Sequence, residues 1–162
     1  MQVSYDICYI NDIIGSGIIC REKINKGDVI WNSIRTPYDK HTHKNTLTIH
    51  EDTSINVITF NETNLEEYLE ELSSDEDVKR FLDLSYGVSG DIHYILDDGK
   101  YVNHSSEPNC ITIMDNATTY ALRDIEIGEM LTEDYSSYSH PDYLKRALKK
   151  YGYEPTYYSW DN

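Results

Sequence analysis

Apolar and polar residues alternate with a period of two in the first and last thirds of the chain. Alternation of this kind predicts half-buried strands. Glycines at 15, 17 and 27 fall between the early runs, where turns are expected. The runs cover residues 3–10, 18–24 and 28–31 near the start, and 93–96, 110–114, 118–122 and 129–135 near the end.

The middle of the chain has a helical period instead. Asn64 and Ser74 are each followed three residues later by an acidic residue, which is the pattern of a helix capping box. It predicts helices over residues 64–72 and 74–84. Each carries one apolar stripe that is expected to face a core. The stripes are Leu65, Leu69 and Leu72, then Val78, Phe81 and Leu82.

Two further elements complete the pattern. Residues 47–50 and 55–60 alternate and predict a hairpin before the helices. Pro141 to Lys150 predicts a short amphipathic helix, because proline stands at its start, cations stand at its end and Gly152 follows. Together these elements predict one mostly β, α+β domain, for which 162 residues with 39% hydrophobic content suffice.

The net charge of −15 narrows the choice of partner. Nucleic acid is excluded as a partner because its recognition needs a basic surface. A basic partner such as a lysine-rich peptide fits better, although the acidity could equally serve solubility alone. The carboxylates between Glu62 and Asp83 are open to the same two interpretations, an acidic platform or a solvated surface.

No apolar run approaches the roughly 18 residues of a membrane span, and the first residues lack the features of a signal peptide. We therefore expect a soluble, intracellular protein, cytoplasmic or nuclear, that is not secreted and has no membrane partner. Cys8, Cys20 and Cys110 are too widely spaced for a zinc cluster, so reduced thiols are expected. His41 and His43 form a His-x-His pair, but no further ligand stands at metal spacing and no metal is predicted.

Three polar motifs follow one another along the chain. The first is Gly15-Ser16-Gly17 leading into IICREKINKGDVI, the second runs from Lys100 to Cys110, and the third is DIEIGEMLTEDY at residues 124–135. Each alone is a weak signal, but their order is specific. Over about residues 3–138 the chain resembles the SET domain, the fold of protein lysine methyltransferases.

The resemblance implies a SET fold of short curved sheets with a pseudoknot, a helical insert and a C-terminal helix. In the pseudoknot the second and third motifs thread past one another, which chains rarely do. The prediction for the whole chain, 1–162, is a single SET domain. Its parts are the N-terminal SET strands 3–36, a variable insert 37–92, the C-terminal SET motifs 93–138, and a C-terminal helix with an aromatic tail 139–162.

The function implied by the resemblance is methyl transfer from S-adenosyl-L-methionine to a lysine side-chain amine of a protein. The expected substrate is a lysine-containing, basic protein or peptide, with histone-like proteins as one option. The alternative is a non-catalytic SET-fold module that binds basic peptides through an acidic face. The number of methyl groups transferred and the oligomeric state are left open.

By the same resemblance, the cofactor would contact Gly15, Ser16, Gly17, Ile18, Asn103, His104 and Tyr135. Glycines allow the backbone to approach a ligand closely, although a plain turn would use them too. The family uses the side chain of the asparagine and mainly the backbone of the histidine, after which Pro108-Asn109 reverses the chain. Tyr135 matches the catalytic tyrosine, and simple packing is the competing role for it.

Some positions depart from the family pattern. Lys100 replaces the usual arginine and lacks its planar fork. Glu133 stands where many members carry a Phe or Tyr that helps to set the number of methyl groups. The cysteine-rich segments that flank many histone enzymes are missing, so the aromatic tail is expected to close the lysine channel or, alternatively, to pin the last helix onto the core. The channel candidates are Glu133, Tyr138, Tyr151, Tyr153, Tyr157, Tyr158 and Trp160.

Overall fold

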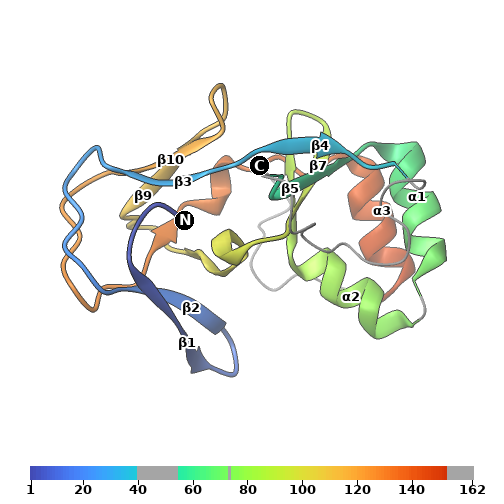
Figure 1. Cartoon of the computed structure of the whole chain (residues 1–162). Coiled ribbons are helices and arrows are strands. Elements are labelled where there is room, and N and C mark those ends of the chain that lie inside the picture. Colours follow the sequence, from blue (N-terminus) through green and yellow to red (C-terminus); the bar gives the residue numbers. More distant parts are fainter. Residues whose placement is uncertain (40–54, 73, 153–162) are drawn as a thin grey trace. The chain divides into compact units, whose positions relative to one another are not determined.

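The computed structural model describes residues 1–39, 55–72 and 74–152 (Figure 1). Contacts between residues divide the chain into two compact units. The first contains residues 1–34 and 98–135, and the second contains 35–97 and the chain after 135. Each unit is made of segments that lie far apart in the sequence. The division into SET strands, insert and tail within a single domain stays a prediction.

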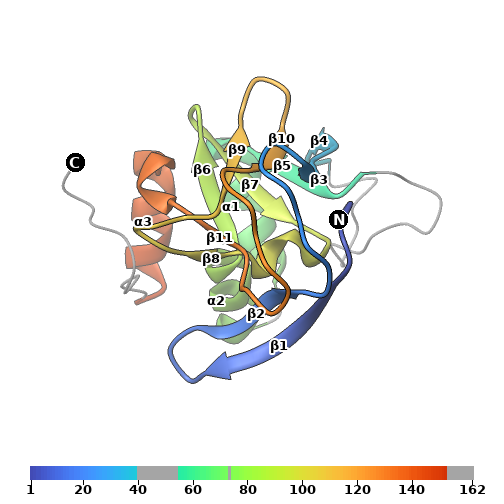
Figure 2. The ribbon, with the colours of Figure 1, turned by 90° about the vertical axis from the view of Figure 1, so that its left-hand side faces the viewer.

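The first unit contains most of the predicted strands. β1 (Tyr5–Asn11) and β2 (Gly15–Cys20) form an antiparallel hairpin, shown in blue in Figure 2. β3 (Val29–Asn32), β10 (Thr118–Ala121) and β9 (Cys110–Ile113) form a three-stranded antiparallel sheet in that order. Four of these strands, β1, β3, β9 and β10, confirm the period-two prediction. β2 corrects it in part, because Gly15 and Gly17, expected in turns, lie within the strand, which ends at Cys20 and not at residue 24.

A parallel pair of very short strands lies in the same unit. β8 (Asn103–His104) pairs with β11 (Thr132–Glu133), so that Asn103 lies opposite Thr132 and His104 opposite Glu133. Short 3-10 helices flank the pair, η1 (Asp98–Tyr101) before β8 and η2 (Tyr135–Ser137) after β11. The pair joins the second sequence motif to the third.

The third motif predicted a longer strand, over 129–135, than the structure contains. Its first residues bond to β2 instead, where Leu131 N donates to the Ile18 carbonyl at 2.9 Å and Cys20 N donates to the Glu129 carbonyl at 2.9 Å. From Thr132 onward the partner is β8. The segment therefore changes partner at its middle, which divides the expected strand.

The second unit contains a four-stranded sheet in the order β4 (Arg35–Pro37), β5 (Val57–Phe60), β7 (Asp91–Ile95) and β6 (Ser85–Val88). β5 and β7 confirm predicted strands, whereas β4 and β6 were not predicted. β5 pairs with β4 on one side and β7 on the other. The predicted hairpin partner, 47–50, lies outside the described residues.

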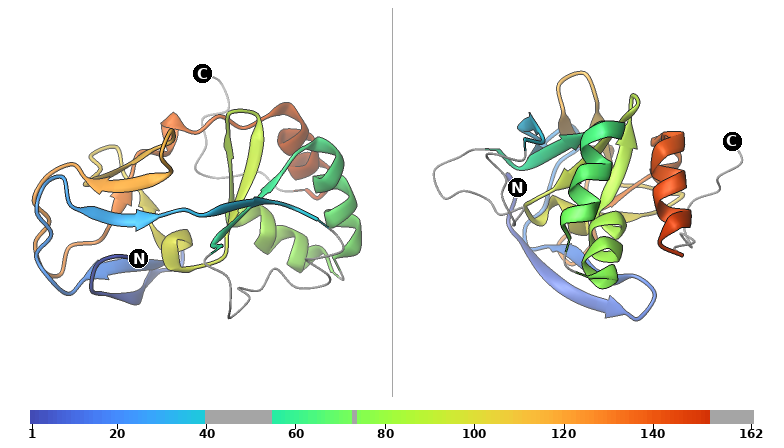
Figure 3. Two further views of the ribbon diagram at one scale, coloured as in Figure 1. Left: turned by 45° about the horizontal axis from the view of Figure 1, so that its top comes forward. Right: turned by 90° about the vertical axis from the view of Figure 1, so that its right-hand side faces the viewer.

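Three helices pack with this sheet around one apolar cluster (Figure 3). They are α1 (Glu62–Glu71), α2 (Asp75–Asp83) and α3 (Asp142–Lys150). The cluster contains the predicted helix stripes, except that Leu72 is only partly buried against it, together with the aromatic rings around them. Its buried members are Tyr38, Ile58, Phe60, Leu65, Tyr68, Leu69, Val78, Phe81, Leu82, Ile92, Leu96, Leu144, Ala147 and Leu148.

The start of α1 corrects one prediction. The N-cap is Asn61, not Asn64: the Asn61 side chain accepts from Asn64 N at 3.1 Å, and the Asn64 side chain accepts from Asn61 N at 2.7 Å. Both partners of this capping box are amides, so the acidic residue expected at its third position is not needed. Ser74 caps α2 as predicted and accepts from Asp77 N at 3.1 Å.

All three cysteines are free thiols, and Cys20 and Cys110 are buried. Burial, together with the nearby negative charges of Glu129 and Glu22, raises the pKa of Cys20 to about 11. Among the described residues, no helix has both the length and the apolar character that a membrane crossing needs. Within the same residues, no three His, Cys, Asp or Glu side chains gather as a metal site would require.

Candidate functional site

Gly15-Ser16-Gly17, called the glycine loop here, forms the first three residues of β2. Gly15 has a φ of +73°, a conformation that residues with a Cβ rarely adopt. Gly17 is buried, and a Cβ at this position would lie 2.7 Å from Met130 Sδ and 2.9 Å from Asn103 Nδ2. Glycine at 17 therefore allows Asn103 and Met130 to reach the backbone of β2.

Asn103 connects this loop to β8. Its Nδ2 donates to the Ser16 carbonyl at 3.0 Å and to the Tyr101 carbonyl at 3.3 Å. Ile18 is fully buried and contributes its carbonyl to Leu131 N. The structure thus brings four predicted cofactor residues together, namely Ser16, Gly17, Ile18 and Asn103.

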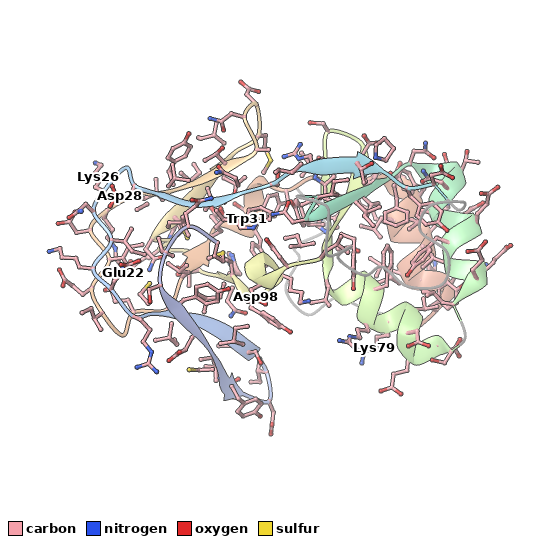
Figure 4. All side chains as sticks on the ribbon, in the orientation of Figure 1. Glu22, Lys26, Asp28, Trp31, Lys79 and Asp98 are labelled. Atoms are coloured by element: carbon pink, nitrogen blue, oxygen red, sulfur yellow. The ribbon has the colours of Figure 1, made fainter. Side chains whose placement is uncertain are left out.

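The segment before Asn103 is attached to β1. The Tyr5 hydroxyl donates to Asp98 Oδ2 at 2.6 Å, and Asp98, labelled in Figure 4, begins η1. Lys100 Nζ lies 5.3 Å from the centre of the Tyr101 ring. Lys100 therefore makes a cation–π contact with its neighbour, although it lacks the fork of an arginine.

Asn109 is a residue whose role sequence reasoning missed. It is buried, its Oδ1 accepts from Thr132 N at 2.9 Å, and its Nδ2 donates to the Met130 carbonyl at 2.8 Å. Its backbone N also donates to the Thr132 carbonyl at 3.2 Å. The side chain of Asn109 therefore holds the backbone that leads into β11. In the sequence, the only local indication of this role was an amide residue directly after a proline.

His104 and Tyr135 meet through the imidazole ring. The Tyr135 backbone N donates to His104 Nδ1 at 3.1 Å, and the two ring centres lie 5.5 Å apart. Asp134 Oδ1 lies 3.9 Å from the same nitrogen. The resemblance implied a role for the histidine backbone, whereas here the side chain also contacts the candidate catalytic residue.

The Tyr135 hydroxyl points to the other end of β8. It donates to the carbonyl of Val102, the buried residue just before Asn103. The Tyr135 hydroxyl and the Val102 carbonyl oxygen thus lie together next to Asn103, which bonds to the glycine loop. Such a pair can orient an amine, since one or both oxygens can accept its N–H groups.

Glu133 is buried beside the first unit's three-stranded sheet. Thr112 Oγ1 donates to its Oε1 at 2.5 Å, and the Thr112 and Thr119 hydroxyls lie 2.7 Å apart. These threonines belong to β9 and β10. Two hydroxyls in series thus hold the carboxylate, and a place for it in the lysine channel stays a prediction.

The remaining channel candidates lie elsewhere. Tyr138 and Tyr151 belong to the second unit, where Tyr138 packs on Tyr86 with ring centres 4.8 Å apart and Tyr151 packs against the apolar cluster. The part they would play in a channel stays a prediction. Tyr153, Tyr157, Tyr158 and Trp160 lie outside the described residues.

The order and pairing of the motifs agree with a comparison to protein families. The family model of the SET domain matches residues 15–136, from the glycine loop to the start of η2. The chain belongs to the SET domain family. Its SET region thus contains the pair formed by β8 and β11, and the resemblance seen in the sequence is confirmed.

Among solved structures of low sequence identity, one shows the same fold. The methyltransferase domain of the human histone-lysine N-methyltransferase SETMAR matches with 19% identity and a TM-score of 0.51, over 84% of this chain and 45% of that one. A candidate histone methyltransferase of Plasmodium falciparum matches with 16% identity and a TM-score of 0.46, over 85% of this chain and 96% of that one. A search of curated protein sequences finds no match. The α+β, mostly β fold of small sheets is confirmed.

Proposed function

We propose that this SET protein is an S-adenosyl-L-methionine-dependent protein-lysine N-methyltransferase. The observation that carries the proposal is the parallel pairing of β8 with β11. It places Asn103 against the glycine loop and His104 against the backbone of Tyr135. The residues that the family resemblance assigns to cofactor and catalysis therefore lie in one place.

The residues near Asn103 fit the cofactor. Both amide protons of Asn103 are directed to the Ser16 and Tyr101 carbonyls, and within the described residues its Oδ1 accepts no hydrogen bond. That oxygen is oriented by two bonds and can accept from the ammonium group of the cofactor. The backbone of residues 15–18 and of His104 would complete the contacts, and bound S-adenosylmethionine would supply an electrophilic methyl group.

Tyr135 would position the lysine. Its hydroxyl and the Val102 carbonyl would orient the amine nitrogen toward the methyl group, a contribution made through geometry. The amine must be neutral to react, and burial among apolar groups favours the neutral form of a lysine. Glu133, Tyr138, Tyr151 and the aromatic residues of the tail are proposed to wall the channel around the lysine stem.

The first test is direct binding of the cofactor. Calorimetry with S-adenosylmethionine, and with its demethylated product, should give binding that persists in the presence of a metal chelator. Binding that disappears on chelation, or fails altogether, contradicts the proposed site. Asn103→Leu is the matched loss-of-binding variant, because it keeps a similar side-chain volume but removes the amide. It should bind the cofactor at least about tenfold more weakly than the wild type.

The second test separates the enzyme from the non-catalytic module. Radioactive methyl groups should pass from the cofactor to lysines of a basic protein, for which core histones serve as the lysine-rich test substrate. Stable peptide binding without transfer would support the alternative function, in which the acidic face alone captures basic peptides. Acid hydrolysis and chromatography of the labelled lysine would also give the number of methyl groups.

A further inference from the structure

The hydrogen bond between Tyr135 N and His104 Nδ1 requires a particular state of the imidazole ring. Nδ1 can accept only when it carries no proton, so the ring must be neutral with its proton on Nε2. Once Nδ1 is protonated it becomes a donor and can no longer accept from a backbone N–H. The contact at 3.1 Å therefore exists in one protonation state of His104.

Solvent can reach this ring. The His104 side chain is 35% exposed, so a proton can be exchanged with water without opening of the unit. The ring is therefore accessible to protons from solvent, and the state of the bond can change with its protonation.

The groups around the ring offer a second arrangement for the protonated form. Asp134 Oδ1 lies 3.9 Å from Nδ1 and can accept from it after protonation. Glu133, the register partner of His104 in β11, is directed to Thr112, and the Tyr135 ring lies 5.5 Å from the imidazole. Protonation would exchange a bond from Tyr135 for a bond to its neighbour Asp134.

We propose that His104 is a positioning residue that holds Tyr135 through Nδ1 and releases it when the ring is protonated. The placement of Tyr135 matters because its hydroxyl donates to the carbonyl oxygen of Val102, the residue just before Asn103. A displacement of about 1 Å at a reacting group can lower a rate about a hundredfold. The effect on rate rests on the proposed function, whereas the hydrogen bond itself does not.

Nuclear magnetic resonance on the wild-type protein tests the bond without any enzymatic activity. The amide proton of Tyr135 should shift upfield as the pH falls, with the same midpoint as the ring protons of His104. Its hydrogen exchange, corrected for pH, should accelerate over the same range. An amide that does not respond while the ring titrates overturns the proposal.

Two variants that each place a polar atom near one ring nitrogen separate positioning from other roles. In His104→Asn the side-chain oxygen lies near the site of Nδ1, and in His104→Gln it lies near the site of Nε2. His104→Asn should lose activity in part and should lack the part of the acid-side decline that follows protonation of the His104 ring, leaving only the part due to the substrate amine. His104→Gln should lose at least about tenfold in kcat at every pH, the equivalent of one hydrogen bond. Equal behaviour of the two variants contradicts the proposal.

The two proposals fail in different ways. If the wild-type protein transfers no methyl groups while the Tyr135 amide follows the ring of His104, the proposed function is wrong and the positioning role of His104 stands. If transfer occurs but its pH profile is the same in the wild type and in His104→Asn, the methyltransferase stands and the inference about His104 is wrong.

Discussion

Tyr135 carries the most direct prediction at the scale of single residues. Tyr135→Phe removes one hydroxyl and leaves the ring in contact with His104. We expect kcat for methyl transfer to fall about a hundredfold or more while cofactor affinity changes little, because the hydroxyl acts by orienting the amine. Single-turnover kinetics and calorimetry would measure the two effects. Full activity in this variant would exclude Tyr135 as the catalytic residue.

Asn109 leads to a prediction about stability. Asn109→Ala leaves Thr132 N and the Met130 carbonyl buried without their side-chain partner, at about 1–3 kcal/mol for each group. The free energy of unfolding, measured with urea, should therefore fall by about 2–6 kcal/mol. Asn116→Ala is the control, because Asn116 is exposed in a turn and its loss should cost less than about 1 kcal/mol.

His93 should make stability depend on pH. It is 3% exposed on β7, and among the described residues its Nδ1 has no hydrogen-bond partner. Burial and the nearby positive charge of Arg35 lower its pKa to about 4. Because the unfolded chain binds the proton more tightly, with a pKa near 6.5, stability present above about 6.5 is lost as the pH falls toward 4, by about 3 kcal/mol in all.

Urea unfolding between pH 7.5 and 4 would measure this loss. His93→Phe should retain more of its stability across the range, because it has no group to protonate. A smaller slope should remain in that variant, since burial and Lys145 also lower the pKa of His140. Identical slopes in the wild type and in His93→Phe would contradict the assignment.

The role of a single residue could be predicted from the sequence only where its motif neighbours or bonding partners lie close to it along the chain. Asn103 stood out because its neighbours belong to a recognisable motif. Asn109 bonds to residues 21 and 23 positions away, and such bonds leave no local pattern. The side-chain role of His104 was missed for the same reason, since its partner Tyr135 lies 31 residues further on.

At the scale of elements, β6 makes a close contact that only glycine permits. A Cβ at Gly87 would lie 2.1 Å from the Ser139 carbonyl oxygen and 2.8 Å from Pro141 Cδ. The chain leading into α3 therefore crosses directly over this strand. The ring of Tyr86, next to Gly87, packs at a tilt on the ring of Tyr138 and adds a second contact at the same crossing.

Gly87→Ala should displace residues 139–141 and destabilise the second unit by about 2 kcal/mol or more, since backbone atoms cannot yield as side chains do. Thermal unfolding would measure the effect. Gly90→Ala is the matched control: its φ is +93° but nothing lies near its Cβ, so it should cost only the strain of about 1–2 kcal/mol. A melting temperature that is unchanged in Gly87→Ala would show that the crossing can shift freely.

Helices and strands differed in how well the pattern predicted them. The apolar stripes of α1 and α2 recur every three or four residues, and this local signal placed both helices correctly apart from the cap at Asn61. β6 was missed because Ser85–Val88 is short and contains a glycine, which weakens any strand signal. The pairing of β8 with β11 involves two residues on each side, and only the motifs could suggest it.

At the scale of the whole molecule, the order of three motifs identified the family where composition could not. The net charge of −15 was compatible with a basic substrate and equally with mere solubility. Exposed carboxylates on α1 and at the start of α2 account for part of this charge. In contrast, α3 is basic at its end, and its Arg146 pairs with Glu62 of α1. An isolated ion pair of this exposed kind contributes little to stability.

The overall charge predicts how substrate binding should respond to salt. If the acidic surface attracts lysine-rich substrates, KM for a lysine-rich peptide should rise several-fold between about 50 mM and 500 mM salt, because the screening length falls from well above 10 Å to under 5 Å. A peptide with the same target lysine but neutral flanking residues should keep a nearly constant KM. That comparison separates attraction of the substrate from effects of salt on the enzyme. Equal KM ratios for the two peptides would mean that the charge serves solubility and that recognition depends on contacts at the site.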